Sequence, residues 1–405
     1  MEWSMGPANG AAPHILVLNR RDTGHPQGGG SERYIERVAF GLAERGYRVT
    51  ICCSSYDGAA PQETVRGVRF RRRGNDLTVH WYALLFLLRA GADLVIDVQN
   101  GLPFCSRLLV RCPVVVLVHH LHREQWRIVF GPVVGRIGWW LESWLGPRVY
   151  RRCQYVTVSQ ATRRGLAEVG VPQSRTLVIH NGMDAVPRLP VQRSPTPLLV
   201  AVSRLAPHKR LEHAIDAVAL LRARWPALRL ELIGQGPWLE ILRSYAAARG
   251  VADAVSLRGW VPEDGKHEAL ARAWVHLCPS VKEGWGIVVM EAAAHGVPTV
   301  AYRSAGGVAE SVRHGSTGLL ASDDLDAFVA AVAALVERHE LRDRMAGACA
   351  ARALEYGWDG TVDAFEAVVA GQLRLPRRPS PAVTEPQAAG DGTAAMAVVK
   401  GPLTG

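Results

Sequence analysis

Short apolar segments alternate with segments of helical periodicity along most of this chain, and this alternation restricts it to folds built on parallel sheets. The first series begins at residues 14–19, a run of strand length that leads into the glycines 28–30. We expect Ser31 to cap an amphipathic helix that closes at Gly46, and residues 48–53 to form the next strand. Strand, glycine-rich loop, helix and strand in this order form a βαβ unit, whose two strands are parallel.

The same pattern continues on both sides of a proline-rich segment, residues 186–197. Before this segment we expect further strands at residues 67–70, 93–98, 113–119, 154–159 and 176–180. After it we expect strands at residues 197–202, 228–233, 254–257, 274–278 and 297–302, separated by helices. The segment itself has four prolines and little periodicity, which is typical of a domain linker.

The chain therefore has two predicted domains of the α/β class, both Rossmann-like, at residues 14–185 and 198–356. We expect residues 1–13 to be a flexible N-terminus. Residues 376–405 are rich in Pro, Ala, Gly and Thr and have no apolar face, so we expect a disordered tail. Two such domains enclose a cleft, and ligands of these sheets bind outside the carboxyl ends of the strands.

Charge and cysteine content restrict the partners and the compartment. The chain has 47 basic and 37 acidic residues, a net charge of +10, which favours nucleotides, nucleic acid or an acidic membrane surface. Seven cysteines without metal-type spacing indicate a reducing compartment. We see neither a signal peptide nor an apolar run of membrane-spanning length, so we expect a cytoplasmic protein, with peripheral membrane contact left open.

The strongest chemical signal is the stretch Pro279–Glu291. An apolar strand, residues 274–278, runs into a loop whose glycines let the backbone approach a ligand closely. The helix that follows offers free N–H groups and a partial positive charge to a phosphate. Glu291 lies in an otherwise apolar helix, where a carboxylate is costly without a partner, and it can reach the hydroxyls of a ribose.

Two cations on one loop form a second signal. Arg204 and Lys209 follow the first strand of the second domain and can hold two phosphate groups from one side. A solvated basic loop is the simpler alternative, but the neighbouring Glu283 to Glu291 stretch favours phosphate binding. The loop at Gly28–Gly30 does not meet the dinucleotide fingerprint, which disfavours a nicotinamide or flavin enzyme, and we expect no cofactor.

His119 comes directly after an apolar strand and should face the cleft. We expect it to form a hydrogen bond with substrate, with a packed structural histidine as the alternative; for His120 and His122 a functional role is disfavoured. Asp324 and Asp326 could bind a divalent ion, but a helix cap is the better explanation, and we expect no metal.

Residues 123–152 interleave tryptophans with arginines. Such a stretch can lie on an anionic membrane or bind nucleic acid, but we favour a pair of helices packed in the core. Nucleic acid is disfavoured further because the basic residues are spread along the chain.

Several motifs together resemble those of family-4 retaining glycosyltransferases of the GT-B fold. The order and spacing match from His14 to about Gln372, and the motifs are Gly28–Glu32, Ser203–Arg204 with Lys209, Ile233–Pro237, Arg258–Val261, and Glu283 with Glu291. The resemblance implies transfer of a sugar from a nucleotide-linked donor, usually UDP- or GDP-linked, to an acceptor hydroxyl. Retention of anomeric configuration, no bound metal, and a late helix at 357–372 that crosses back to the first domain are also implied.

The resemblance also implies roles for individual residues. Arg204 and Lys209 would hold the diphosphate and Glu291 the ribose, while Val261 would lie beside the base. The remaining donor-binding and catalytic positions are Glu283, Gly284, Trp285, Gly286 and Ile287 at the donor sugar, Gly234 in the Ile233–Pro237 turn, His119 at the transferred sugar, and Gly29 and Gly30 at the phosphates and acceptor. Trp285 departs from the smaller residue of many relatives, which can alter the sugar pocket.

Two other functions remain as alternatives. A nucleotide-sugar epimerase has a similar two-domain shape, although the pair Glu283 and Glu291 favours transfer. A non-catalytic sugar-nucleotide-binding protein would bind donors without turnover. The sequence does not reveal the donor base, the sugar or the acceptor; a lipid-linked acceptor is one candidate.

Overall fold

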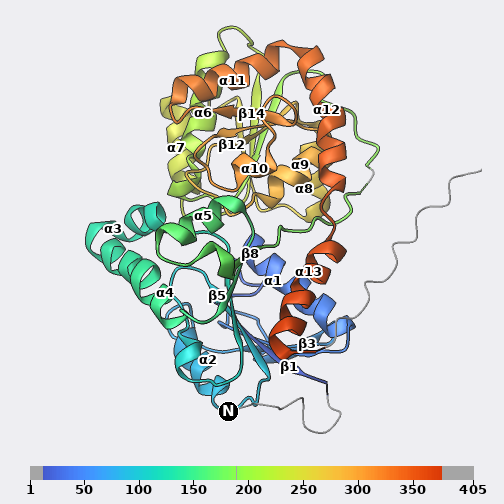
Figure 1. Cartoon of the computed structure of the whole chain (residues 1–405). Coiled ribbons are helices and arrows are strands. Elements are labelled where there is room, and N and C mark those ends of the chain that lie inside the picture. The colour runs from blue at the N-terminus through green and yellow to red at the C-terminus, as the bar shows by residue number, and fades with distance from the viewer. Residues whose placement is uncertain (1–11, 188, 376–405) are drawn as a thin grey trace, which may run out of the picture.

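The protein folds into two α/β lobes stacked along one axis, as the computed structural model shows (Figure 1). The structure describes residues 12–187 and 189–375, so the predicted N-terminus, apart from residues 12 and 13, and the predicted tail lie outside the described residues. The segment 186–197 joins the lobes, and the C-terminal helix α13 (Trp358–Leu373) returns from the second lobe to the first.

The first lobe is built on an eight-stranded sheet in the order β3-β4-β2-β1-β5-β6-β7-β8. Its strands are β1 (His14–Leu18), β2 (Arg48–Cys53), β3 (Gln62–Val65), β4 (Val68–Arg72), β5 (Leu94–Gln99), β6 (Val114–Val118), β7 (Gln154–Thr157) and β8 (Thr176–Val178). Its helices are α1 (Gly30–Glu44), α2 (Val79–Leu87), α3 (Arg123–Trp140), α4 (Gly146–Val149) and α5 (Gln160–Glu168), with short turns η1 (Ser106–Leu108), η2 (Leu141–Leu145) and η3 (Gln173–Arg175).

The second lobe has a six-stranded sheet in the order β11-β10-β9-β12-β13-β14, and its neighbouring strands are parallel. The strands are β9 (Leu198–Val202), β10 (Arg229–Ile233), β11 (Val255–Gly259), β12 (Val275–Cys278), β13 (Thr299–Tyr302) and β14 (Gly318–Ala321). The helices are η4 (Pro207–Lys209), α6 (Leu211–Leu221), α7 (Leu239–Ala248), α8 (Glu263–Arg272), α9 (Ile287–Ala294), α10 (Val308–Ser311), α11 (Leu325–Glu337) and α12 (His339–Leu354).

The apolar runs of the sequence form the central strands because helices cover both faces of each sheet. Every residue of β1, β5 and β6 is buried, as expected of a parallel sheet with two covered faces. Two parallel-sheet Rossmann-like domains around a cleft, the predicted fold class, are thus confirmed. One edge differs: β3 pairs with β4 antiparallel through a tight turn at Arg66 and Gly67.

Two predictions about helix starts have different outcomes. The first helix begins at Gly30 with Gly29 at its N-cap, so the prediction that Ser31 caps it is wrong. The carboxylate of Glu32 instead accepts a hydrogen bond from the Gly29 N–H at 2.9 Å. The cap on α11 is confirmed, because the Asp324 carboxylate accepts from the Ala327 N–H at 2.7 Å.

Residues 123–152 do not form the core helix pair that we favoured, and that prediction is wrong. Helix α3 breaks at Gly131, whose φ of 76° is outside the helical region, and Pro132 follows. The apolar side chains with exposures of 43 to 71% on this segment are Ile128, Val129, Phe130, Val133, Val134, Ile137, Trp140 and Trp144. We call these eight residues the α3 apolar face.

The return of α13 fixes the lobes to each other. It packs against α1, where Val362 fills the space that a side chain at Gly41 would need. Arg45 of α1 pairs with Glu366 of α13 at 3.0 Å and also with Asp363. The chain thus crosses between the lobes twice, at the linker and where it enters α13.

Candidate functional site

A cleft of about 1580 Å³ lies between the carboxyl ends of the two sheets. The first lobe contributes the loop before α1 and the segment after β6, and the second contributes η4, the loop after β12 and the start of α9. The predicted site residues that line this cleft are Gly29, Gly30, His119, Arg204, Lys209, Glu283, Gly284, Trp285, Gly286, Ile287 and Glu291. Segments far apart in the sequence therefore meet at one place.

The loop after β12 forms one wall of the cleft. Gly286 has a φ of 87°, a conformation that favours glycine, and α9 begins at the next residue. The first N–H groups of α9 have no acceptor within the helix, so they can bind an anion in the cleft. Gly284 lies against the first lobe, where an added Cβ would come within 2.7 Å of the His119 carbonyl oxygen. A side chain at position 284 would push the lobes apart.

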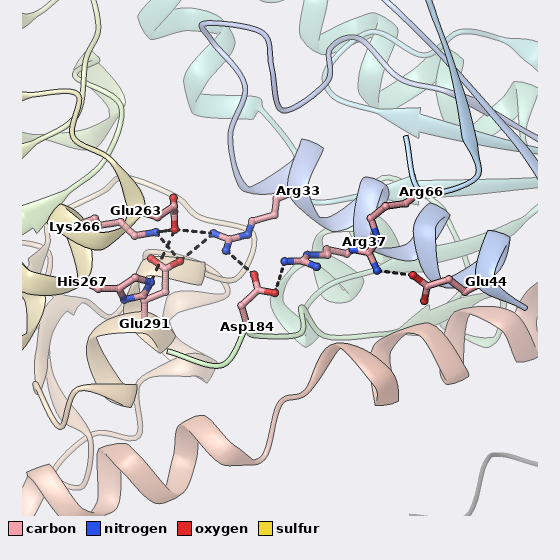
Figure 2. Close-up of polar contacts among 9 residues, drawn as sticks. All are labelled: Arg33, Arg37, Glu44, Arg66, Asp184, Glu263, Lys266, His267 and Glu291. Carbon is pink, nitrogen blue, oxygen red and sulfur yellow. Dashed lines mark hydrogen bonds and ion pairs between the residues drawn. The ribbon is translucent and has the colours of Figure 1, made fainter. Parts of the chain in front are cut away.

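Glu291 of α9 is a buried carboxylate, 3% exposed, with cations from both lobes beside it (Figure 2). Its Oε1 lies 2.8 Å from Nζ of Lys266 on α8 and 3.1 Å from Nη1 of Arg33 on α1. These two partners offset the cost of burying the charge. Its Oε2 is buried and finds no hydrogen-bond partner in the described part of the chain. One oxygen is thus held and the other is available to a ligand.

Arg33 connects the two lobes through charge. Besides Glu291 it contacts Asp184 at 2.5 Å, and Asp184 in turn contacts Arg37 at 2.5 Å (Figure 2). Burial alone would lower the pKa of Arg33, but the charges of Glu291 and Asp184 outweigh it and raise this pKa. The guanidinium therefore remains charged at the boundary between the lobes.

Lys209 and Glu283 form an ion pair at the centre of the cleft. Burial raises the pKa of Glu283, but the charge and hydrogen bond of Lys209 and a 2.7 Å hydrogen bond from Ser280 lower this pKa by more. The pKa of Glu283 therefore lies below its ordinary value. Glu283 is therefore ionised at neutral pH. Arg204 is exposed in the same cleft, and the described residues offer its guanidinium no ion-pair partner. This side of the cleft has unbalanced positive charge.

His119 follows β6 and faces the cleft from the first lobe. Burial lowers its pKa to about 3, and the nearby charge of His122 adds to this, so the ring is neutral at physiological pH. Its Nε2 is buried and without a hydrogen-bond partner among the residues described. The edge of Tyr34 packs against the ring at a centroid distance of 5.3 Å, which fixes its orientation. A neutral imidazole with a free nitrogen can bind a sugar hydroxyl.

Three of the predicted site residues, Gly234, Val261 and Trp285, are placed differently from the other predicted site residues. Gly234 and Val261 do not line the cleft, although Gln235, Gly236 and Trp260 beside them do. Gly234 has a φ of 132°, and an added Cβ would come within 1.9 Å of the Ser203 carbonyl oxygen, so this position serves close backbone packing. The Trp285 ring packs on His180 and Tyr356, at centroid distances of 4.4 and 5.0 Å, where it joins the lobes.

Sequence reasoning missed four residues of the site. Arg33 and Lys266 are the partners of Glu291, and His122 lines the cleft with Glu142 bonded behind it. The rarity of lysine was a usable signal, because Lys209, Lys266, Lys282 and Lys400 are the only lysines in the sequence. No local pattern connects His122 with Glu142, which lie 20 positions apart.

One group of potential metal ligands lies beside the cleft in the described ranges, namely Glu263, His267 and Glu291. The ammonium of Lys266 lies 2.8 Å from an oxygen of each glutamate. A cationic side chain thus already balances the charge that a metal ion would balance, and this group does not fit a metal site.

The described helices include none that is both long and apolar enough to cross a bilayer.

Two Rossmann-like lobes around a cleft are the architecture of the GT-B fold, and solved structures share this fold. Sucrose-phosphate synthase from Thermosynechococcus elongatus superposes with a TM-score of 0.72 at 17% identity, covering 89% of this chain and 99% of that one. Anabaena HepE in complex with UDP-glucose gives a TM-score of 0.70 at 18% identity, over 88% of this chain and 99% of that one.

The chain belongs to the group 1 and family 4 glycosyltransferases. The family model described as "Glycosyltransferase Family 4" matches residues 28–186, and the model described as "Glycosyl transferases group 1" matches residues 190–350. The family predicted from the sequence motifs is therefore confirmed.

Curated relatives match parts of the chain. A GDP-mannose-dependent alpha-(1-6)-phosphatidylinositol monomannoside mannosyltransferase of Mycobacterium tuberculosis is 40% identical over 31% of this chain and 34% of its own length. D-inositol 3-phosphate glycosyltransferase of Streptomyces griseus is 32% identical over 43% of this chain and 40% of its own length. The glycogen synthase of M. tuberculosis is 26% identical over 87% of this chain and 94% of its own. The first two matches thus span well under half of those relatives.

Proposed function

We propose that this protein moves a sugar from a UDP- or GDP-linked donor to an acceptor hydroxyl with retention of anomeric configuration. The observation that carries the proposal is the meeting of Lys209, Arg204, Glu283, Glu291 and His119 in one cleft between two lobes. A relative that depends on GDP-mannose and a neighbour solved with UDP-glucose support a donor of one of these two kinds.

The cations supply the largest part of the proposed catalysis. The diphosphate lies between Arg204, Lys209 and the N-terminus of α9, where preorganised positive charge stabilises the leaving group. The free Oε2 of Glu291 accepts a hydrogen bond from the ribose, and Glu283 with neutral His119 binds hydroxyls of the donor sugar.

A displacement through a carboxylate nucleophile finds little support in the first lobe. Among the described residues that line the cleft there, the acidic ones are Glu32 and Asp76. Glu32 binds the Gly29 N–H, and Asp76 pairs with Arg20 and Arg21. Both carboxylates are already engaged, which favours a mechanism driven by departure of the diphosphate.

The acceptor is proposed to arrive from an anionic membrane surface. Three residues of the α3 apolar face, Ile128, Val129 and Phe130, also line the cleft, so the exposed face and the site are continuous. The exposed arginines of this segment are Arg123, Arg127, Arg136, Arg148, Arg151 and Arg152. Apolar and tryptophan side chains beside arginines are suited to the interface of an anionic bilayer.

A donor screen tests the proposed function. Thermal unfolding is followed with UDP-, GDP- and ADP-sugars, since a bound ligand raises the midpoint by mass action. The donor that stabilises most is then incubated with acceptors, and release of nucleoside diphosphate is measured. Binding without turnover would support a binding protein instead, and formation of an epimer of UDP-GlcNAc without acceptor would support an epimerase.

A further inference from the structure

Glu142 is a buried carboxylate of the first lobe that does not itself line the cleft. Its side chain is fully buried on the π-helical turn η2, which follows α3. It accepts hydrogen bonds from Nε1 of Trp126 at 2.7 Å, from Nδ1 of His122 at 2.9 Å and from the His122 backbone N–H at 3.2 Å. All its donors come from the start of α3.

These hydrogen bonds fix the tautomer of the His122 ring. Because a carboxylate can only accept, Nδ1 of His122 carries the hydrogen, and in the neutral ring Nε2 is then a free acceptor. The side chain is 18% exposed and lines the cleft. A histidine with one nitrogen bonded to a buried carboxylate and the other open to a cleft can accept a proton.

His122 also faces the donor side of the cleft. Burial lowers the pKa of His208 on η4 to about 3, and after Lys209 and Arg204 the charge of His122 contributes to this shift. His122 is thus electrostatically coupled to the residue before Lys209. Its ring packs on His120 at a centroid distance of 4.2 Å, within the same wall of the cleft.

The surrounding segment is built to hold this arrangement. The Trp126 ring occupies the space above Gly138, where an added Cβ would come within 2.4 Å of the indole. Gly135 allows the two halves of α3 to approach, since a Cβ there would meet the Trp126 carbonyl oxygen at 2.8 Å. If Glu142 served only to cap α3, its contact with the backbone N–H of His122 would suffice, without the bond to the ring.

We propose that His122 binds the acceptor hydroxyl and takes its proton, and that Glu142 is the positioning residue for His122. The proposal rests on the transferase function proposed above. The acceptor oxygen forms the new bond to the anomeric carbon, the bond from that carbon to the diphosphate breaks, and its electron pair leaves with the diphosphate. The hydroxyl proton passes to Nε2 of His122 and then to solvent.

The test uses the full chain and the donor that stabilises it most in the screen, with water as the acceptor probe and release of nucleoside diphosphate as readout. His122→Ala should lower kcat by about 10²-fold or more while the KM for donor stays within about twofold. Added imidazole should restore part of the rate, because it supplies the missing base; a merely structural loss would not respond. His339→Ala, an exposed histidine on α12, is the matched control.

A second variant keeps the test valid if His122→Ala is poorly folded. Glu142→Gln keeps the shape of the side chain but has one acceptor oxygen, so it cannot accept from both Nδ1 of His122 and the indole N–H of Trp126. If Glu142 positions His122, kcat should fall while the KM for donor stays within about twofold. Unchanged kcat in both variants overturns the inference and leaves the transferase function standing. Wild-type protein that turns over none of the donors with any acceptor of the screen overturns the transferase function, and this inference with it.

Discussion

Glu291 is the single charge on which the donor half of the site depends most. It lies in a helix whose neighbouring positions are apolar and buried, and two cations hold one of its oxygens. Glu291→Gln removes the charge but keeps the shape, so a bond to the ribose is weakened and Lys266 and Arg33 lose their counter-charge. Hydrogen bonds to charged groups contribute about 1.5–3 kcal/mol, so the Kd for nucleoside diphosphate should rise about 10- to 100-fold.

Isothermal titration with UDP and GDP measures this change. The matched control is Glu240→Gln, an exposed glutamate on α7 whose Kd should equal that of the wild type. An unchanged Kd in Glu291→Gln would remove the residue from the ribose site.

Lys209 should matter for turnover more than for folding. Its ammonium pairs with Glu283 in the cleft, and in the proposed mechanism it stabilises the leaving diphosphate. Loss of one preorganised donor typically costs about 10²–10³-fold in rate, and we expect this for Lys209→Ala at saturating donor. Steady-state kinetics with Lys282→Ala as control check it, since Lys282 is a neighbouring lysine that does not line the cleft. A kcat equal to that of the wild type would contradict the role.

At the residue scale the sequence was informative where one local pattern contained the whole signal. Glu283 and Glu291 belong to one loop and helix, and both line the cleft as expected. Arg33 and Glu291 lie 258 positions apart, so their pairing depends on how the lobes meet and no local spacing encodes it. Gly234 shows a different limit. The sequence correctly indicated that glycine matters at this position, but close packing against the backbone requires it, not contact with the cleft.

Helix α3 is the element for which the fold and the proposed function make the most specific claim. Its apolar face is exposed and continuous with the cleft, and arginines flank it. Val133→Asp with Ile137→Asp should abolish sedimentation with vesicles that contain phosphatidylglycerol, because charge is added where side chains would enter the bilayer. Leu220→Asp, an exposed leucine on α6, should leave sedimentation unchanged.

Vesicles of neutral phosphatidylcholine provide the second comparison. If wild-type protein does not sediment with the anionic vesicles, or sediments equally well in the double variant, the membrane assignment of this face is wrong.

Strand β12 carries a buried histidine that we expect to couple stability to pH. Burial lowers the pKa of His276 from 6.5 to about 4, and Thr299 on β13 contacts its Nδ1 at 3.1 Å. Between these two values the unfolded chain binds the proton and the folded chain does not, so stability falls as the pH drops. From pH 7.5 to 5 this group alone should cost about 2 kcal/mol.

Urea denaturation at both pH values measures this contribution. His276→Asn keeps an acceptor for Thr299 but cannot titrate, so its stability should fall by about 2 kcal/mol less than that of the wild type over this interval. His339→Asn should behave as the wild type does. Equal pH dependence in all three proteins would show that His276 does not contribute.

Elements were predictable where burial was two-sided. The apolar runs of β1, β5 and β6 identify them as central strands, whereas β3, with three exposed residues out of four, has no such signal. The tryptophans and arginines interleaved in residues 123–152 left open whether this segment packs in the core or lies on the surface. Gly131 and Pro132 were the available signs of the break within α3.

The whole molecule is organised by close contact between the lobes at the cleft. Gly284 lies against His119, the Trp285 ring lies between His180 and Tyr356, and α13 crosses back onto α1. A sugar bound between Glu283 and His119 would therefore be surrounded by both lobes, which limits access of water. The proposed transfer depends on both lobes together.

The anomeric configuration of the product is the most direct test of the proposed transferase. The donor chosen by the screen is incubated with protein and acceptor, and the anomeric proton of the first-formed product is observed by NMR. We expect the configuration of the donor to be kept, with release of one nucleoside diphosphate per glycosidic bond. An inverted product, or no glycosidic product from a donor that binds, would contradict the proposed function.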